Sequence, residues 1–146
     1  MKLGVTQIAC LAACLSAGKM SPVAAAEKPP VIVVRGPTVV AFFEPITQAE
    51  LQRNPDTNDA LSDFQFYATR VREPLGKAGI AFHELYARSF RLRIQNRSIT
   101  FRPVKVTVGY YLIAPGKEPR VEYGVITDAD LVKVAKEYFG ASRPAD

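Results

Sequence analysis

The sequence predicts an α/β fold, and three observations lead to this prediction. Runs of β-branched and aromatic residues, typical of strands, alternate with segments whose apolar residues recur every three or four positions, as in a helix. The last third of the chain has the pattern of strand, turn, strand and helix. The length of 146 residues and the 48% hydrophobic content suit one globular domain with a core of its own.

The amino-terminal segment 1–26 has the pattern of an export signal, so we expect it to lie outside the fold. It starts with a positive Lys2, continues with a mostly apolar stretch and ends in three alanines, which form a typical cleavage site. We therefore expect cleavage near Ala26, one domain over 27–146, and a periplasmic or secreted location.

A second processing route stays open. Leu11-Ala12-Ala13-Cys14 resembles the lipobox of bacterial lipoproteins, in which the cysteine becomes the acylated first residue. This route would give a membrane-tethered lipoprotein acylated at Cys14. Both cysteines, Cys10 and Cys14, precede the domain, so we expect no disulfide, cysteine nucleophile or cysteine metal site within 27–146.

Two strands are predicted to open the domain, at 31–34 and 38–43. Both segments are nearly continuous apolar runs rich in β-branched residues, which is typical of strands buried on both faces. Gly36-Pro37 separates them, and Pro45 ends the second strand because proline has no amide hydrogen to give to a ladder. Two such strands imply a sheet that is covered on both sides.

Two helical segments follow. Thr47 and Glu50 have the capping-box spacing that starts a helix, and Asn54-Pro55 soon interrupts it. The next, longer helix carries an apolar stripe with spacings of three and four, and proline and glycine in its last turn close it near Lys77. The stripe consists of Leu61, Phe64, Ala68, Val71 and Leu75.

The middle of the chain predicts a strand over 80–85 and a hairpin over 90–101. In the hairpin, apolar residues at every second position alternate with arginines, which predicts one apolar face and one basic face. Asn96-Arg97 offers the turn. A helix within 85–94 is the alternative that the sequence leaves open.

The last third predicts a second hairpin and a closing helix. Segment 104–114 is rich in strand-forming residues, 115–117 is a Pro-Gly-Lys turn, and 120–123 pairs back. The final amphipathic helix is expected to start at Thr127 and to stop at Gly140.

This order of elements resembles the thioredoxin-like fold over about 31–139. The likeness is greatest at 108–139, which looks like that family's penultimate strand, turn, last strand ending in Tyr-Gly, and closing helix. Segment 39–44 is similar to the apolar strand that leads into the family's active site. The resemblance implies a single thioredoxin-like domain, with a central mixed sheet, flanking helices and a C-terminal hairpin plus helix.

The chain departs from that family at the redox site. Where its members carry a CxxC motif, this chain has Pro45-Ile46-Thr47-Gln48, with no thiol. The proline that usually stands before the penultimate strand is missing too, since Thr107-Val108-Gly109 occupies that place. The resemblance therefore implies a domain without redox activity.

Few residues are candidates for catalysis. His83 is the only histidine, and Glu44 stands where the redox centre would be, so a cysteine-independent enzyme would use one of these two. A packed or surface histidine is the plainer interpretation of His83. Ala87 replaces the second histidine of a zinc-protease motif, and the acidic residues at 56–63 do not have the spacing of a calcium loop. We expect no metal and no cofactor.

Arginines form the one concentrated surface feature that the sequence predicts. On a hairpin, Arg91 and Arg93 point the same way and give a basic surface for an acidic protein face or an anionic envelope component. A solvated strand face that protects a sheet edge is the alternative. The full set of candidate binding residues is Arg88, Arg91, Arg93, Arg97 and Arg102.

These observations favour an exported, non-catalytic binding or accessory domain. Without segment 1–26 the chain keeps 17 basic and 14 acidic residues, a net charge of +3. This excess is small for a protein that binds phosphate backbones, so we expect no nucleic-acid partner. A cysteine-independent enzyme and a membrane-tethered lipoprotein are the alternatives. The pattern predicts no oligomeric state.

Overall fold

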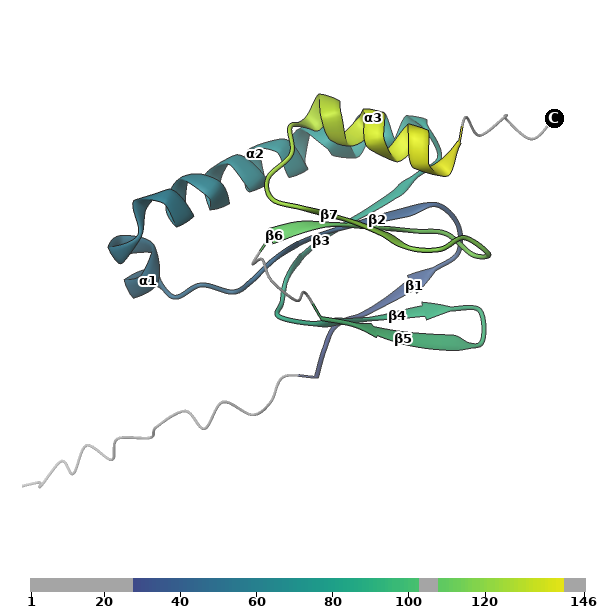
Figure 1. Ribbon diagram of the computed structural model, residues 1–146, viewed down its shortest axis with the longest axis horizontal. Coiled ribbons are helices and arrows are strands. Elements are labelled where there is room, and N and C mark those ends of the chain that lie inside the picture. The colour runs from purple at the N-terminus through teal and green to yellow at the C-terminus, as the bar shows by residue number, and fades with distance from the viewer. Residues whose placement is uncertain (1–27, 103–107, 141–146) are drawn as a thin grey trace, which may run out of the picture.

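The structure has three layers: helices, a four-stranded sheet and a three-stranded sheet. It is a computed structural model that describes residues 28–102 and 108–140. In Figure 1 the helices lie above the four-stranded sheet and the three-stranded sheet lies below it. The predicted α/β class is confirmed. The expected signal segment 1–26, with Cys14, lies outside the described residues.

The four-stranded sheet, called the central sheet here, is mixed. Its order is β3-β2-β6-β7, with β2 parallel to β3, and β6 antiparallel to both β2 and β7. Parallel neighbours need a long crossover, which a helix supplies between β2 and β3. Of the strand predicted over 104–114, residues 104–107 lie outside the described part. The strands are β2 (Thr38–Phe43), β3 (Ala81–Tyr86), β6 (Val108–Ile113) and β7 (Arg120–Tyr123).

The three-stranded sheet, called the outer sheet here, corrects the expectation of one central sheet. Its order is β1-β4-β5, with β1 parallel to β4, and β4 antiparallel to β5. Because β2 already has β3 and β6 on its two sides, no place beside it is left for β1, which pairs with β4 instead. The strands are β1 (Val31–Val34), β4 (Phe90–Ile94) and β5 (Arg97–Phe101).

The burial of β1 also differs from the prediction. Ile32 and Val34 are buried, but Val31 is 53% exposed and Val33 is 41% exposed. A run of four β-branched residues shows no alternation in the sequence, so it does not reveal whether one face or both faces are covered. The strand is buried on one face only, because the outer face of the outer sheet is open to solvent.

The segment over 85–94 contains strand residues and no helix, which settles the alternative in favour of the hairpin. β4 and β5 pair from Phe90 opposite Phe101 to Ile94 opposite Arg97. The two turn residues are therefore 95 and 96, one position earlier than predicted. The predicted third strand also lies one residue later, over 81–86.

Capping residues fix where the first two helices begin. Thr47 and Glu50 form the predicted capping box, because the Thr47 hydroxyl accepts from the Glu50 amide while the Glu50 carboxylate accepts from the Thr47 amide. Asn54 ends α1 and caps α2, so the predicted break is confirmed. The helices are α1 (Gln48–Arg53), α2 (Pro55–Lys77) and α3 (Asp128–Phe139).

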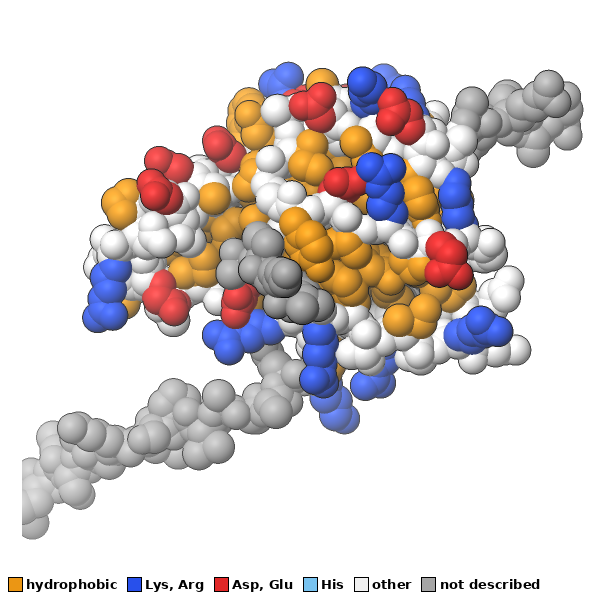
Figure 2. Space-filling model, viewed as in Figure 1, with side chains coloured by type: hydrophobic (Ala, Val, Ile, Leu, Met, Phe, Trp, Pro, Cys, Tyr) orange, Lys and Arg blue, Asp and Glu red, His pale blue; other side chains and the backbone are white. Residues whose placement is uncertain are grey.

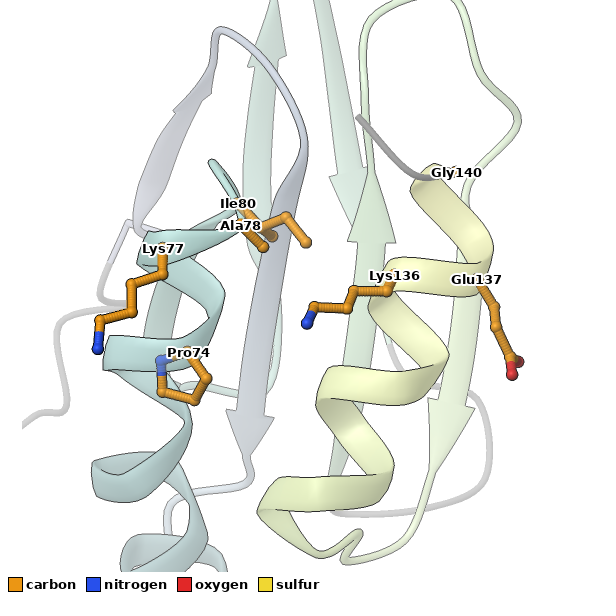
Figure 3. Close-up of a pocket in the computed structure, with 7 residues that line it drawn as sticks. All are labelled: Pro74, Lys77, Ala78, Ile80, Lys136, Glu137 and Gly140. Atoms are coloured by element: carbon orange, nitrogen blue, oxygen red, sulfur yellow. The ribbon is translucent and has the colours of Figure 1, made fainter. Parts of the chain in front are cut away.

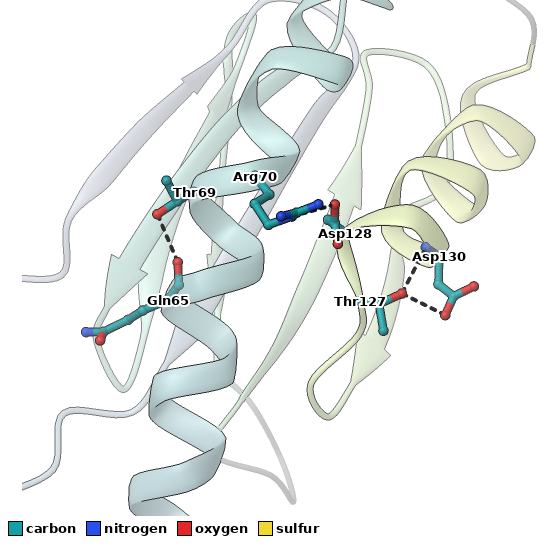
Figure 4. Close-up of polar contacts among 6 residues, drawn as sticks. All are labelled: Gln65, Thr69, Arg70, Thr127, Asp128 and Asp130. Carbon is teal, nitrogen blue, oxygen red and sulfur yellow. Dashed lines mark hydrogen bonds and ion pairs between the residues drawn. The ribbon is translucent and has the colours of Figure 1, made fainter.

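An ion pair joins the start of α3 to the middle of α2. Thr127 caps α3 as predicted, because its hydroxyl accepts from the Asp130 amide. Beside this cap, Arg70 Nε of α2 lies 3.2 Å from Asp128 Oδ2 (Figure 4). The carboxylates of the first turn also suit the positive end of the helix dipole. This exposed ion pair adds little stability, and α3 lies beside α2 because both helices pack on the same core over one face of the central sheet.

The core on the helical side forms around β2. Val39, Ala41 and Phe43 face the helices, and Leu131 and Ala135 of α3 close the core from above. The predicted stripe of α2 is confirmed as its buried face, except that Leu61 is only partly buried. The buried members of the stripe are Phe64, Ala68, Val71 and Leu75.

A second core fills the space between the two sheets, and aromatic rings dominate it. Phe42 of β2 and Tyr111 of β6 meet Phe90 and Phe101 of the hairpin, with contacting ring centroids 4.5 to 6.0 Å apart. Tilted rings at these separations attract one another beyond the burial of their area. The outer sheet is thus attached to the central sheet by its apolar inner face.

We predict that Gly109→Ala destabilises the domain. A Cβ at Gly109 would lie 2.5 Å from the carbonyl oxygen of Glu122 and 2.9 Å from the Phe42 ring. The shift of backbone and side chains needed to accommodate this Cβ is expected to lower the free energy of unfolding by about 1–3 kcal/mol, measured by urea denaturation. The control, Gly76→Ala, adds a Cβ in open space in the last turn of α2 and should raise stability by up to about 1 kcal/mol. Equal losses in both variants would contradict this explanation.

We predict that Gln95→Gly stabilises the hairpin turn. Gln95 has a φ of 51°, and it is the one non-glycine residue within 28–102 and 108–140 with a positive φ. Glycine adopts this conformation without steric cost, so the expected gain in the free energy of unfolding is about 0.5–1 kcal/mol. Asn96→Gly changes the neighbouring turn residue, whose φ is not positive, and should not stabilise. A gain in both variants, or in neither, would argue against relief of strain.

Candidate functional site

The outer face of the outer sheet is open and carries both arginines that the sequence singled out. Val31 lies beside Arg91, and Val33 lies beside Arg93, because β1 and β4 pair in that register. The β5 residues opposite the arginines are hydroxyl side chains, and all these residues are exposed. We call this surface the basic face; it consists of Val31, Val33, Arg91, Arg93, Ser98 and Thr100.

Charge is divided unequally between the layers. The three strands of the outer sheet contain three arginines and no acidic residue, and no Asp or Glu occurs at 28–43 or 85–117. The three helices contain eight acidic and six basic residues. In Figure 2 the charged side chains along the lower margin, over the outer sheet, are blue, whereas red ones appear among the blue ones over the helices. The outer sheet is therefore the positive side of the molecule.

The structure brings together two of the five arginines predicted for binding. Arg91 and Arg93 share the basic face, while Arg97 and Arg102 are exposed at the two ends of β5 and flank it. Arg88 lies apart, in the connection between β3 and β4. The two exposed valines and the two hydroxyl residues were not among the predicted binding residues, because their place on this face depends on strand pairing.

Arg88 belongs to a different site. Its Nε lies 2.8 Å from Glu44 Oε1 at the carboxyl end of β2, where a cleft of about 330 Å³ opens beside α1. Glu50 also lines this cleft, but the hydrogen bond from the Thr47 amide lowers the pKa of its carboxyl and keeps it ionised. Both carboxylates of this cleft are thus engaged within the fold, Glu44 by Arg88 and Glu50 by the cap of α1.

His83 is separate from Glu44. It lies in the middle of β3, beside Val40 of β2. Glu44 follows Val40 by four positions, which is about 13 Å along an extended strand. His83 is half-buried on the side of the outer sheet, and no hydrogen-bond partner is found for it among the described residues. The two candidate catalytic residues therefore do not converge on one substrate.

A further cavity, of about 490 Å³, lies between the carboxyl ends of α2 and α3. Pro74, Ala78 and Ile80 give it an apolar lining, and Lys136 reaches across it toward α2, as Figure 3 shows. Lys77, on the rim, forms an ion pair with Glu73 at 2.6 Å. No nucleophile with an adjacent base lies in this lining, so it offers no constellation for catalysis.

The described residues contain neither a metal-binding cluster nor a membrane-spanning helix. Within 28–102 and 108–140, no group of three His, Cys, Asp or Glu side chains is close enough to hold a metal ion. The helices of this part are too short or too polar to cross a membrane.

Comparison with protein-family models, curated proteins and solved structures gives no significant match. The fold and its surfaces are therefore the basis on which a function is proposed.

We predict that His83 makes stability depend on pH. Burial, and secondarily the charge of Arg72, lowers the pKa of His83 below its ordinary value of 6.5. At a pH between the lowered pKa of the folded state and the ordinary pKa of the unfolded chain, the unfolded chain binds more protons than the folded one. Stability therefore rises with pH in this range and falls as pH drops below about 6.5. Urea unfolding at about pH 7.5 and about pH 5.5 is expected to show a smaller loss for His83→Gln than for the unsubstituted chain. The same loss in both would remove His83 as the cause.

Proposed function

We propose that this chain is an exported, non-catalytic binding module, and that the basic face is its binding surface for an anionic partner. Export rests on the pattern of segment 1–26. The absence of catalysis rests on the separation of Glu44 from His83 and on the ion pair that engages Glu44. The binding role rests on one observation, the open face that carries Arg91 and Arg93.

We also propose that the architecture is a thioredoxin-like variant. Two parallel strands joined by a long helix, then an antiparallel hairpin and a closing helix on the same side of the sheet, support this assignment. The outer sheet covers the opposite side of the central sheet. With no thiol near 45–48, such a domain has no redox chemistry of its own, which leaves its surfaces to carry the function.

Arg91 and Arg93 are not engaged in ion pairs within the described part of the chain. Among the described residues, both lie beyond ion-pair distance of any carboxylate. Their guanidinium groups are therefore available to an external anion, which they can bind through two parallel hydrogen bonds. The paired arginines, in contrast, are Arg70, Arg72, Arg88 and Arg120.

Protection of a sheet edge explains these two residues poorly. Charged side chains protect strands whose backbone groups lack a partner strand. β4, which carries Arg91 and Arg93, is the middle strand of the outer sheet, and the edges are β1 and β5. β1 instead presents two exposed valines. A binding role accounts for arginines on the middle strand without this difficulty.

The test is a charge reversal with a matched control. Arg91→Glu/Arg93→Glu changes the basic face, and Lys133→Glu/Lys136→Glu makes the same change in net charge on exposed positions of α3. The probes are anionic phospholipid vesicles, poly-glutamate and an anionic polysaccharide. We expect at least one probe to bind the first variant at least about tenfold more weakly than the control, because two charge-assisted contacts are lost.

Thermal unfolding of both variants checks that the fold is kept, since all four side chains are exposed. The proposal is wrong if the unsubstituted protein binds none of the probes, or if both double variants lose affinity equally. Equal losses would show that net charge alone governs binding.

A further inference from the structure

Apolar and cationic side chains stand side by side on the basic face. Each exposed valine of β1 stands beside an arginine of β4, and neighbouring strands lie about 4.8 Å apart. The rows end on the hydroxyls of Thr100 and Ser98. Arginine places its aliphatic stem along apolar surface and its guanidinium at the polar boundary. Such rows match a partner that has an anionic surface layer directly above an apolar layer, as a phospholipid bilayer has.

The shape of the basic face suits a planar partner. It is one side of a three-stranded sheet, and none of the cavities described above is lined by any of its six residues. Stable protein interfaces bury about 800 Å² on each side and are rich in aromatic anchors. The basic face has six residues and no aromatic one, so it is a poor match for an acidic protein. Two copies of the chain would bring like charges together.

The charge division orients the molecule. An anionic plane attracts the outer sheet, which has no acidic residue, and repels the helical layer, which has more acidic than basic residues. Each arginine near an anionic leaflet contributes about fivefold to the partition coefficient, and this attraction weakens with salt. Arg97 and Arg102, at the two ends of β5, extend the positive region beyond Arg91 and Arg93.

The amino-terminal segment joins the fold on the same layer. The described part begins at Lys28, and β1 of the outer sheet begins at Val31. In the lipoprotein route, residues 15–30 therefore connect an acylated Cys14 directly to an edge strand of the outer sheet. A lipid anchor at Cys14 would also keep the basic face near the bilayer.

From these four observations we infer that the basic face docks on an anionic phospholipid bilayer, with the guanidinium groups of Arg91 and Arg93 on lipid phosphates and the side chains of Val31 and Val33 at the acyl boundary. The inference rests on the proposed function, because it names the anionic partner of that same face. The binding is peripheral and reversible by salt, since only two apolar side chains enter.

Vesicle co-sedimentation tests this inference on the chain as recovered from a bacterial host, with intact mass confirming the same amino terminus in every variant. The vesicles contain about one third phosphatidylglycerol, or phosphatidylcholine alone, in about 0.05 M or about 0.5 M NaCl. We expect binding to the anionic vesicles at low salt and loss of it at high salt. Arg91→Gln/Arg93→Gln is expected to lower the partition coefficient about 25-fold. The control Lys133→Gln/Lys136→Gln is expected to stay within about threefold of the unsubstituted chain.

A valine variant separates a bilayer from a soluble polyanion. Val31→Ser/Val33→Ser keeps both arginines, so it should weaken vesicle binding severalfold and leave poly-glutamate binding unchanged. Equal binding to the two kinds of vesicle, or no effect of the arginine substitutions, would overturn the inference. Arginine-dependent binding of poly-glutamate with no binding of vesicles would also overturn it, while the proposed function would stand with an acidic protein as the partner.

Discussion

The complete burial of β2 is the constraint on which the rest of the fold depends. All six of its residues are buried, so both faces of the strand need a covering layer. Val39, Ala41 and Phe43 pack against the helices, and Val40 and Phe42 pack against the outer sheet. A parallel neighbour, β3, requires a long crossover, which places α2 on the first face. The second face needs another layer, and the chain supplies a sheet.

The outer sheet is a layer with one covered face, and this explains its composition. Phe90 and Leu92 point into the aromatic core, so Arg91 and Arg93, at the alternating positions of β4, must point to solvent. The pleat therefore requires exposed side chains here but does not require arginines, because any polar residue would satisfy solvation. Solvation alone does not explain why two unpaired arginines stand beside two exposed valines. For this reason the face is a candidate for binding.

The sequence predicted those features that local patterns determine. The stripe of α2, the capping box at Thr47 and the hairpin over 90–101 all follow from the spacing of neighbouring residues, and the structure has them. The pairing of β1 with β4 joins segments about 60 residues apart, and no spacing in either segment specifies it. The second sheet, the exposed valines and the place of Arg88 all depend on such pairings, so sequence patterns alone did not reveal them.

The layered design also separates stability from the candidate function. In β4 the side chains that hold the outer sheet to the core and those of the basic face occupy alternate positions, so each set can change with little effect on the other. At the Glu44 cleft this separation is absent, because Glu44 pairs with Arg88 and Glu50 caps α1. Residues that already stabilise the fold are constrained against acting on a substrate. The basic face carries no such constraint, and its side chains are therefore free to be selected for a partner.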